Sequence, residues 1–283
     1  MKFRLALIGF GNVAQGLAKI LVEKREYLRR NFDFDYGIVA VADIMKGSIM
    51  SKKGLDLGRL LSIAKETGSL RDYPGGVRGR SSIDTIREAN ADVLVEATWT
   101  NLKDGEPGLT HIKTALNEGL HVVTTNKGPI ALAYHELAAL ARRKRRHLRF
   151  EGTVLSGTPA ISLATEALAG STINSIRGIL NGTTNYILGE MEAGRTYNEA
   201  LNMARELGYA EADPSGDVEA WDPAAKITIL ANVLMGGEVK LKEVRREGIT
   251  GISHCDLREA RSTGSRIKLV AKAYRDEGRI KAQ

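Results

Sequence analysis

Gly9-Phe10-Gly11-Asn12-Val13-Ala14 separates an apolar run, residues 3–8, from a helical pattern that begins at Val13 and continues to about Arg30. The spacing matches G-x-G-x-x-G/A, where the first glycine allows a tight turn, the second admits a pyrophosphate and the third small residue lets helix and strand pack closely. N–H groups at the start of the helix would hold the phosphate. We therefore predict a dinucleotide site at Gly9, Phe10, Gly11, Asn12 and Val13. The alternative is a glycine-rich turn without a ligand.

The pattern on both sides of this turn is typical of an α/β protein. Apolar runs at residues 38–42, 92–97 and 121–124 alternate with helical patterns at residues 108–118 and 134–146, and residues 148–151 read as one more strand. Continuously apolar strands joined by helices predict a parallel sheet covered on both faces. Residues 48–80 are interpreted as an inserted helix and loops. We predict a Rossmann-type dinucleotide-binding domain over residues 1–150.

A second domain, α+β in class, is predicted for residues 151–283, after the glycine- and threonine-rich turn at residues 152–159. Thr196-x-x-Glu199 has the form of a capping box, which predicts a helix that ends near Gly208. Asp222-Pro223 has the form of an N-cap followed by a first-turn proline, which predicts a helix that ends near residues 236–237.

Composition limits the function class. The 283 residues are 43% hydrophobic and 27% charged, and no stretch reaches the roughly 18 to 20 apolar residues of a membrane span. The single cysteine, Cys255, forms no internal disulfide, so we expect a reducing compartment, the cytoplasm. The net charge is +7, but the densest basic run, residues 142–146, ends a predicted helix and is interpreted as a solvated terminus. We expect no nucleic-acid and no membrane partner.

Asp43 ends the second predicted strand, where an acidic side chain accepts hydrogen bonds from the adenosine ribose and disfavours a 2′-phosphate. This position favours NAD. NADP stays open, because Lys46, Lys52 and Lys53 follow and any of them could neutralise a 2′-phosphate.

Several blocks in fixed order resemble the homoserine dehydrogenases. They are residues 96–101, 105–108, 124–129, 181–188 and 208–214, followed by Asp217 and Asp222-Pro223-Ala224-Ala225-Lys226, and they span nearly the whole chain. The resemblance implies reversible hydride transfer between L-homoserine and NAD(P)+, giving L-aspartate 4-semialdehyde, as in threonine, methionine and isoleucine biosynthesis. It also implies a homodimer built through the second domain's sheet. No separate amino-acid-binding regulatory domain is recognised in the sequence, so we expect the form of the family without one. The alternative is a non-catalytic NAD(P)-binding sensor on the same fold.

The same resemblance assigns roles to individual residues. Lys226 is the proton donor or acceptor, Lys127 lies at the junction of nicotinamide and substrate, and Asp222 belongs to the catalytic set. Substrate contacts are assigned to Glu211, Asp222, Lys226, Thr184 and Asp217, and further cofactor contacts to Thr98, Trp99, Thr100 and Lys127. From spacing alone, Asp222 and Lys226 share a helix face at i, i+4, which is more commonly a surface ion pair than a catalytic one.

Two further features are compared with the family. Residues 151–159 resemble its loop whose backbone carbonyls hold a monovalent cation such as Na+, which assigns Glu151, Val154, Ser156 and Thr158, with a turn that binds no ion as the alternative. The chain stops at Gln283, whereas family members continue through a glycine- and alanine-rich segment that returns to the nucleotide domain. We therefore expect a C-terminal segment to be missing from this sequence.

Overall fold

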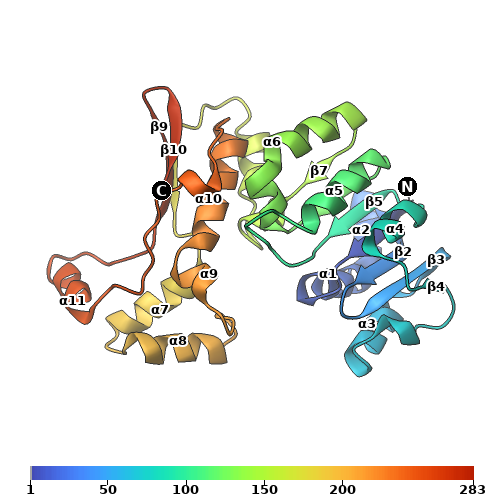
Figure 1. Cartoon of the computed structure of the whole chain (residues 1–283), viewed down its shortest axis with the longest axis horizontal. Helices are drawn as coiled ribbons and strands as arrows, with labels where there is room; N and C mark the ends of the chain where they lie inside the picture. Colours follow the sequence, from blue (N-terminus) through green and yellow to red (C-terminus); the bar gives the residue numbers. More distant parts are fainter. Residues whose placement is uncertain (1) are drawn as a thin grey trace. The chain divides into compact units, whose positions relative to one another are not determined.

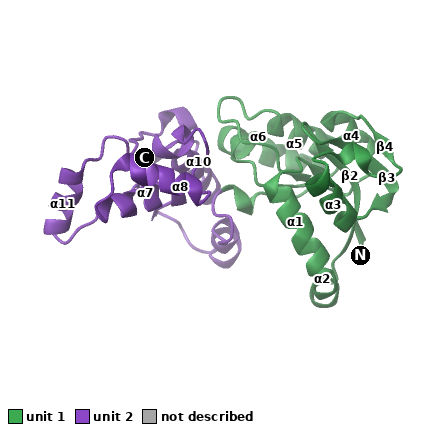
Figure 2. Cartoon of the chain, turned by 90° about the horizontal axis from the view of Figure 1, so that it is seen from below, with its two compact units in different colours: residues 1–153 green, residues 154–283 purple. Residues whose placement is uncertain are grey.

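The computed structural model describes residues 2–283, and the chain divides into two compact units, residues 1–153 and 154–283 (Figures 1 and 2). The division lies a few residues after the expected boundary between residues 150 and 151. Each unit has its own sheet and its own buried cluster of hydrophobic side chains.

The first unit is built on a seven-stranded sheet in the order β4-β3-β2-β1-β5-β6-β7. Its strands are β1 (Lys2–Ile8), β2 (Asp35–Asp43), β3 (Gly47–Leu55), β4 (Val77–Arg78), β5 (Val93–Glu96), β6 (His121–Thr124) and β7 (Leu148–Arg149). Strands β1, β2, β5, β6 and β7 are parallel, and β3 and β4 are antiparallel additions at one edge. The order reverses direction at β1, between β2 and β5, so the predicted Rossmann-type sheet is confirmed.

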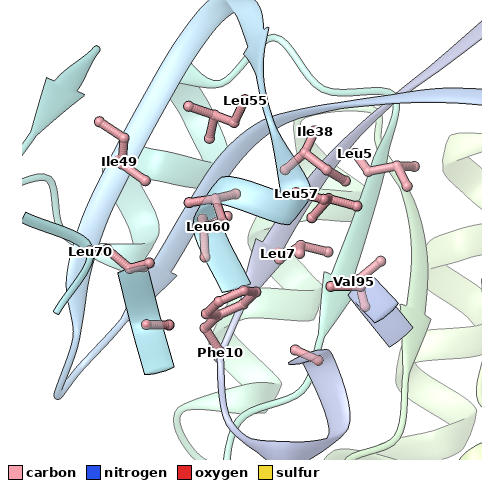
Figure 3. Packing of buried hydrophobic residues seen from close by; sticks show 14 of the residues in the cluster. Leu5, Leu7, Phe10, Ile38, Ile49, Leu55, Leu57, Leu60, Leu70 and Val95 are labelled. Atoms are coloured by element: carbon pink, nitrogen blue, oxygen red, sulfur yellow. The ribbon is translucent and has the colours of Figure 1, made fainter. Parts of the chain in front are cut away.

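Helices cover both faces of this sheet. They are α1 (Asn12–Glu23), α2 (Arg25–Phe32), α3 (Leu57–Glu66), α4 (Ser82–Glu88), α5 (Gly108–Asn117) and α6 (Lys127–Lys144). Leu5 and Leu7 of β1 pack in one cluster with α1 and α3, and Phe10 joins Leu60 and Leu70 there (Figure 3). Ala6 and Ile8 point to the opposite face by strand alternation and are equally buried. The continuously apolar run is therefore explained by burial on both sides.

Three sequence-based expectations for this unit are wrong in detail. Residues 48–80 contain β3 and β4 besides α3, because the antiparallel pair extends the sheet edge beside β2. The helical pattern after Val13 is broken at Lys24 into α1 and α2. Helix α6 begins at Lys127 rather than near Tyr134, since Asn126 caps it and a kink at Ala133 lies between the two parts.

The second unit joins five helices to a three-stranded antiparallel sheet in the order β10-β9-β8. The helices are α7 (Gly182–Glu192), α8 (Tyr197–Glu206), α9 (Ser215–Val218), α10 (Trp221–Leu234) and α11 (His254–Ser262), and the strands are β8 (Ser175–Gly178), β9 (Ala271–Asp276) and β10 (Arg279–Ala282). The capping box of Thr196 and Glu199 is confirmed. Asp222 is not an N-cap, because α10 begins at Trp221 with Ala220 in the capping position and Asp222 already in its first turn. No helix within residues 2–283 is long and apolar enough to cross a membrane.

Candidate active site

The glycine turn lies where the sheet order reverses. Gly9 has φ +86°, and a Cβ there would stand 2.5 Å from the carbonyl oxygen of Ala97 at the end of β5. The Gly9 N–H donates to Ala42 O at 2.8 Å, which ties the turn to β2 as well. At Gly11 an added Cβ would meet nothing within 4 Å, and no side chain caps α1. Open space at an uncapped helix N-terminus fits a pyrophosphate.

Phe10 and Asp43 hold this turn in shape. The Phe10 ring is fully buried, while its backbone N–H donates to Asp43 Oδ2 at 2.8 Å. Asp43 Oδ1 accepts from the backbone N–H groups of Met45 and Lys46, each at 2.9 Å. Burial opposes the charge on Asp43, but these N–H donors outweigh it and keep its pKa below the ordinary value. Asn12 and Val13 are exposed on the first turn of α1.

A pocket of about 550 Å³ opens beside the turn, within the size range of small-molecule sites. Its lining includes Gly9, Gly11 and Asp43, together with Trp99, Arg71 and Arg80. Lys52 and Lys53 are not near it, because β3 runs antiparallel to β2 and places them beside residues 38–40, away from Asp43. Sequence reasoning missed the two arginines, which precede and follow β4 and are brought to Asp43 only by the added strands.

The ends of β5 and β6 are joined by the buried carboxylate of Glu96. This residue is 0% exposed, and its Oε1 accepts from the backbone N–H of Thr98 at 3.1 Å and from the Thr98 hydroxyl. Its Oε2 accepts from Thr124 Oγ1 at 2.8 Å. Burial opposes the charge of Glu96, but the neighbouring His111 ring and the donors from Thr98 and Thr124 outweigh it and lower its pKa. The block of residues 96–101 began at Glu96, but its side chain was not singled out from the sequence; the one available signal was a charged residue at the end of an apolar strand.

The cofactor residues predicted after β5 flank this carboxylate. Thr98 and Trp99 line the pocket, and Trp99 is 53% exposed. Thr100 is exposed in the same loop. Lys127 is the first residue of α6, directly after the N-cap Asn126, and is half-buried.

In the second unit, the predicted pair on α10 is closed. Lys226 Nζ lies 2.7 Å from Asp222 Oδ2 and donates to Leu180 O at 2.7 Å. The two side chains are 15% and 12% exposed, so this is not the surface ion pair that spacing alone allowed. An ammonium with a carboxylate and a carbonyl as acceptors is held in one orientation.

Asn181 connects the other residues predicted to contact substrate. Its Nδ2 donates to Asp217 Oδ1 at 2.6 Å and to Asp222 Oδ2 at 2.9 Å. Its Oδ1 accepts from the Thr184 backbone N–H and the Thr184 hydroxyl, at 2.8 and 2.9 Å. The asparagine belongs to the quoted block 181–188, but its function as a hub between α7, α9 and α10 depends on tertiary contacts that the sequence does not show.

The hydrogen bonds described above do not include Glu211 or the residues of the predicted cation loop. Glu211 is exposed and makes no hydrogen bond or ion pair within residues 2–283. Of the cation loop, Glu151 begins a 3₁₀ turn, Val154 is buried, and residues 154–160 contain neither helix nor strand. No group of three or more His, Cys, Asp or Glu side chains in the described chain is arranged to hold a metal.

Comparison with known proteins gives one family for both units. Residues 9–151 match the model of the homoserine dehydrogenase NAD-binding domain, and residues 159–283 match the homoserine dehydrogenase model. An NAD(+)-dependent homoserine dehydrogenase of Pseudomonas canavaninivorans is 43% identical over 99% of this chain and 80% of its own length. A homoserine dehydrogenase of Methanocaldococcus jannaschii is 45% identical over 94% of this chain and 79% of its own. A hyperthermophilic archaeal homoserine dehydrogenase solved with NADPH has a TM-score of 0.83 at 30% identity, with 100% of this chain and 81% of that one covered.

Proposed function

The chain belongs to the homoserine dehydrogenase family, and we propose that it interconverts L-homoserine and L-aspartate 4-semialdehyde with NAD(P) as the hydride carrier. The observation that carries this proposal is the closed Lys226–Asp222 pair beside the Asn181 hub. Oxidation of an alcohol requires a group that takes the hydroxyl proton while a hydride leaves the carbon. When bound, the nicotinamide supplies the hydride acceptor or donor.

Lys226 is proposed as the proton-transferring group. In the reducing direction its ammonium gives a proton to the carbonyl oxygen as hydride adds to the carbonyl carbon, so that the alcohol forms. In the oxidising direction its neutral amine takes the proton of the hydroxyl. Asp222 and Leu180 O fix the nitrogen in either case, because both are acceptors within 2.7 Å. This agrees with the family assignment of Lys226, and we keep Lys127 as the residue at the junction of nicotinamide and substrate.

The amino group of the substrate needs an acidic partner. Asp217 and Asp222 are both bound to the Asn181 amide, so two carboxylates of different elements converge at one point. Such a pair orients an ammonium by charge-assisted hydrogen bonds. We propose these two, together with Glu211, as the head-group site; Thr184 is fully buried, so we propose that it acts through Asn181.

For the cofactor, we propose use of either NAD or NADP with NAD slightly favoured. Asp43 supports NAD through the ribose hydroxyls. Arg71 and Arg80 line the same pocket and would attract a 2′-phosphate. The named relatives include an NAD(+)-dependent enzyme and a structure with NADPH, so neither cofactor is foreign to the family.

Three further assignments are proposed on the resemblance. A homodimer is proposed through the sheet of the second unit, whose β8 and β10 are its edge strands. A monovalent cation is proposed at the carbonyls of Glu151, Val154, Ser156 and Thr158, supported by the irregular loop at residues 154–160. The cytoplasm is the proposed compartment, supported by the single exposed Cys255.

The direct test is homoserine-dependent reduction of NAD+ and of NADP+ by the unaltered chain and by Lys226→Met. We expect turnover in the unaltered chain and a loss of about 10²- to 10⁴-fold in kcat for the variant, the usual contribution of a general acid–base group. NADH binding should be unchanged in Lys226→Met. Tight dinucleotide binding without any homoserine-dependent reduction would favour the sensor instead.

A further inference from the structure

Glu96 is a buried ionised group that takes no part in the proton transfer described above. It lies at the end of β5, is 0% exposed, and carries a pKa below its ordinary value. A buried carboxylate is unfavourable unless donors surround it, so its retention in the core calls for an explanation.

The donors come from the carboxyl ends of two neighbouring strands. The turn after β5 supplies the N–H and hydroxyl of Thr98, and Thr124, the last residue of β6, supplies its hydroxyl. Thr124 Oγ1 in turn accepts from the Asn126 N–H at 3.0 Å. His111 stands behind the carboxylate, with Nδ1 3.7 Å from Glu96 Oε1 and Nε2 2.8 Å from Ser82 Oγ.

Asn126 connects the end of β6 to the turn after β5 by hydrogen bonds. Its Nδ2 donates to Trp99 O at 3.0 Å and contacts Thr98 Oγ1 at 3.2 Å. Its Oδ1 accepts from the Gly128 N–H at 3.1 Å and so caps α6, whose first residue is Lys127. The pocket-lining turn and the start of α6 are therefore fastened to the same carboxylate.

We propose that Glu96 is a positioning residue for dinucleotide binding, which locks the turn after β5 to the turn after β6 so that Thr98, Trp99 and Lys127 keep one arrangement. The proposal rests on the proposed function. Negative charge suits the task because a carboxylate accepts from the turn after β5 and from the end of β6 at once. An amide has one oxygen and offers a donor where Thr98 or Thr124 now donates.

Glu96→Gln keeps the shape and removes this double acceptance. We expect the Kd for NADH, measured by fluorescence without substrate, to rise about tenfold, the equivalent of roughly one charge-assisted hydrogen bond. Asp92→Asn is the matched control, because Asp92 lies just before β5 at the opposite end and binds Arg4 instead. It should lower the melting temperature but leave the Kd unchanged. Thr124→Val, which removes the donor to Glu96 and the acceptor for the Asn126 N–H, serves if Glu96→Gln does not fold.

A second readout needs no dinucleotide. Amide hydrogen exchange should accelerate at residues 97–101 and 124–128 in Glu96→Gln and stay unchanged there in Asp92→Asn. Unchanged exchange in both turns, or an equal rise of Kd in both variants, would overturn the positioning role. If the unaltered chain binds NADH but does not turn over homoserine, the proposed function fails while the exchange result still decides the inference.

Discussion

Asn181 donates its side-chain amide to Asp222 Oδ2 at 2.9 Å, and the same oxygen lies 2.7 Å from Lys226 Nζ. One carboxylate oxygen thus receives a neutral donor and a cationic one. Because the amide adds no charge, Asn181 can orient Asp222 without competing electrostatically with Lys226. The same amide holds Asp217 at 2.6 Å, where two carboxylates would otherwise repel each other.

Replacement of Asn181 by Asp should impair turnover more than folding. A third carboxylate would face Asp217 and Asp222 and remove the donor between them, so substrate and Lys226 would lose their fixed partners. We expect kcat/KM for homoserine to fall by about 10- to 100-fold, the effect of one to two charge-assisted hydrogen bonds. NADH binding should be unaffected, since the affected residues lie in the second unit.

Asn232→Asp is the matched control for this variant. Asn232 is also buried in α10 and pairs with both backbone groups of Val239, so its replacement destabilises the fold through the same chemistry. It should reduce the melting temperature with little change in kcat/KM. Equal loss of kcat/KM in both variants would mean that Asn181 matters for stability alone.

Gly9→Ala should abolish tight dinucleotide binding. An added Cβ would stand 2.5 Å from Ala97 O, and φ +86° is unfavourable for alanine, so the turn must move away from β5 at a cost of about 1–3 kcal/mol. Gly16→Ala in α1 is the control, because nothing lies within 4 Å of its added Cβ. Calorimetric titration should show that Gly9→Ala loses its affinity for NADH, whereas Gly16→Ala keeps it. Gly16→Ala should also gain roughly 0.5–1 kcal/mol of stability. Unimpaired NADH affinity in Gly9→Ala would place the cofactor elsewhere.

How far the sequence leads depends on whether a contact is local. The glycine turn, the Thr196 capping box and the i, i+4 pair of Asp222 and Lys226 depend on near neighbours in the chain, and the structure forms all three. Apolar runs joined by helices predicted the parallel sheet, so the fold class was predictable although the strand order was not. Strand β3 was not, because its half-polar sequence Gly47–Leu55 is stabilised by pairing with β2.

The contacts that complete the site are long-range. Asn181 reaches Asp217 and Asp222 across 36 and 41 residues, and Glu96 reaches Thr124 across 28. Nothing in a local pattern distinguishes such side chains from ordinary polar surface residues. The one available signal was the position of Glu96 at the end of an apolar strand. A charge at such a position indicates hydrogen-bond donors buried around it.

Arg71 should affect NADPH binding more than NADH binding. Its side chain lies against the β2–β3 turn, with Cγ 3.5 Å from the position of a Cβ on Gly47, and it lines the pocket with Asp43. Loss of its charge in Arg71→Ala should raise the Kd for NADPH by roughly tenfold and leave that for NADH nearly constant. Arg59→Ala is the control, because Arg59 packs over the Tyr73 ring and does not line the pocket. An equal change for both nucleotides would assign Arg71 to the adenine or the pyrophosphate.

Acidification should remove the contribution of Glu96 to stability. Its pKa is lowered in the folded chain, because the neighbouring His111 ring and the donors from Thr98 and Thr124 outweigh the cost of burial. Near pH 4.3, roughly the pKa of a glutamate in an unfolded chain, this side chain therefore binds more protons in the unfolded than in the folded state. The stabilisation by the Glu96 charge is fully present above that pH and is lost as the pH falls through the lower pKa of Glu96 in the folded chain. We expect the difference in free energy of unfolding between the unaltered chain and Glu96→Gln to be constant near neutrality and to shrink below about pH 4.3. Urea unfolding at a series of pH values measures it, and other carboxylates cancel in the difference. If burial won instead, the folded pKa would be raised, and the difference would begin to shrink well above that pH.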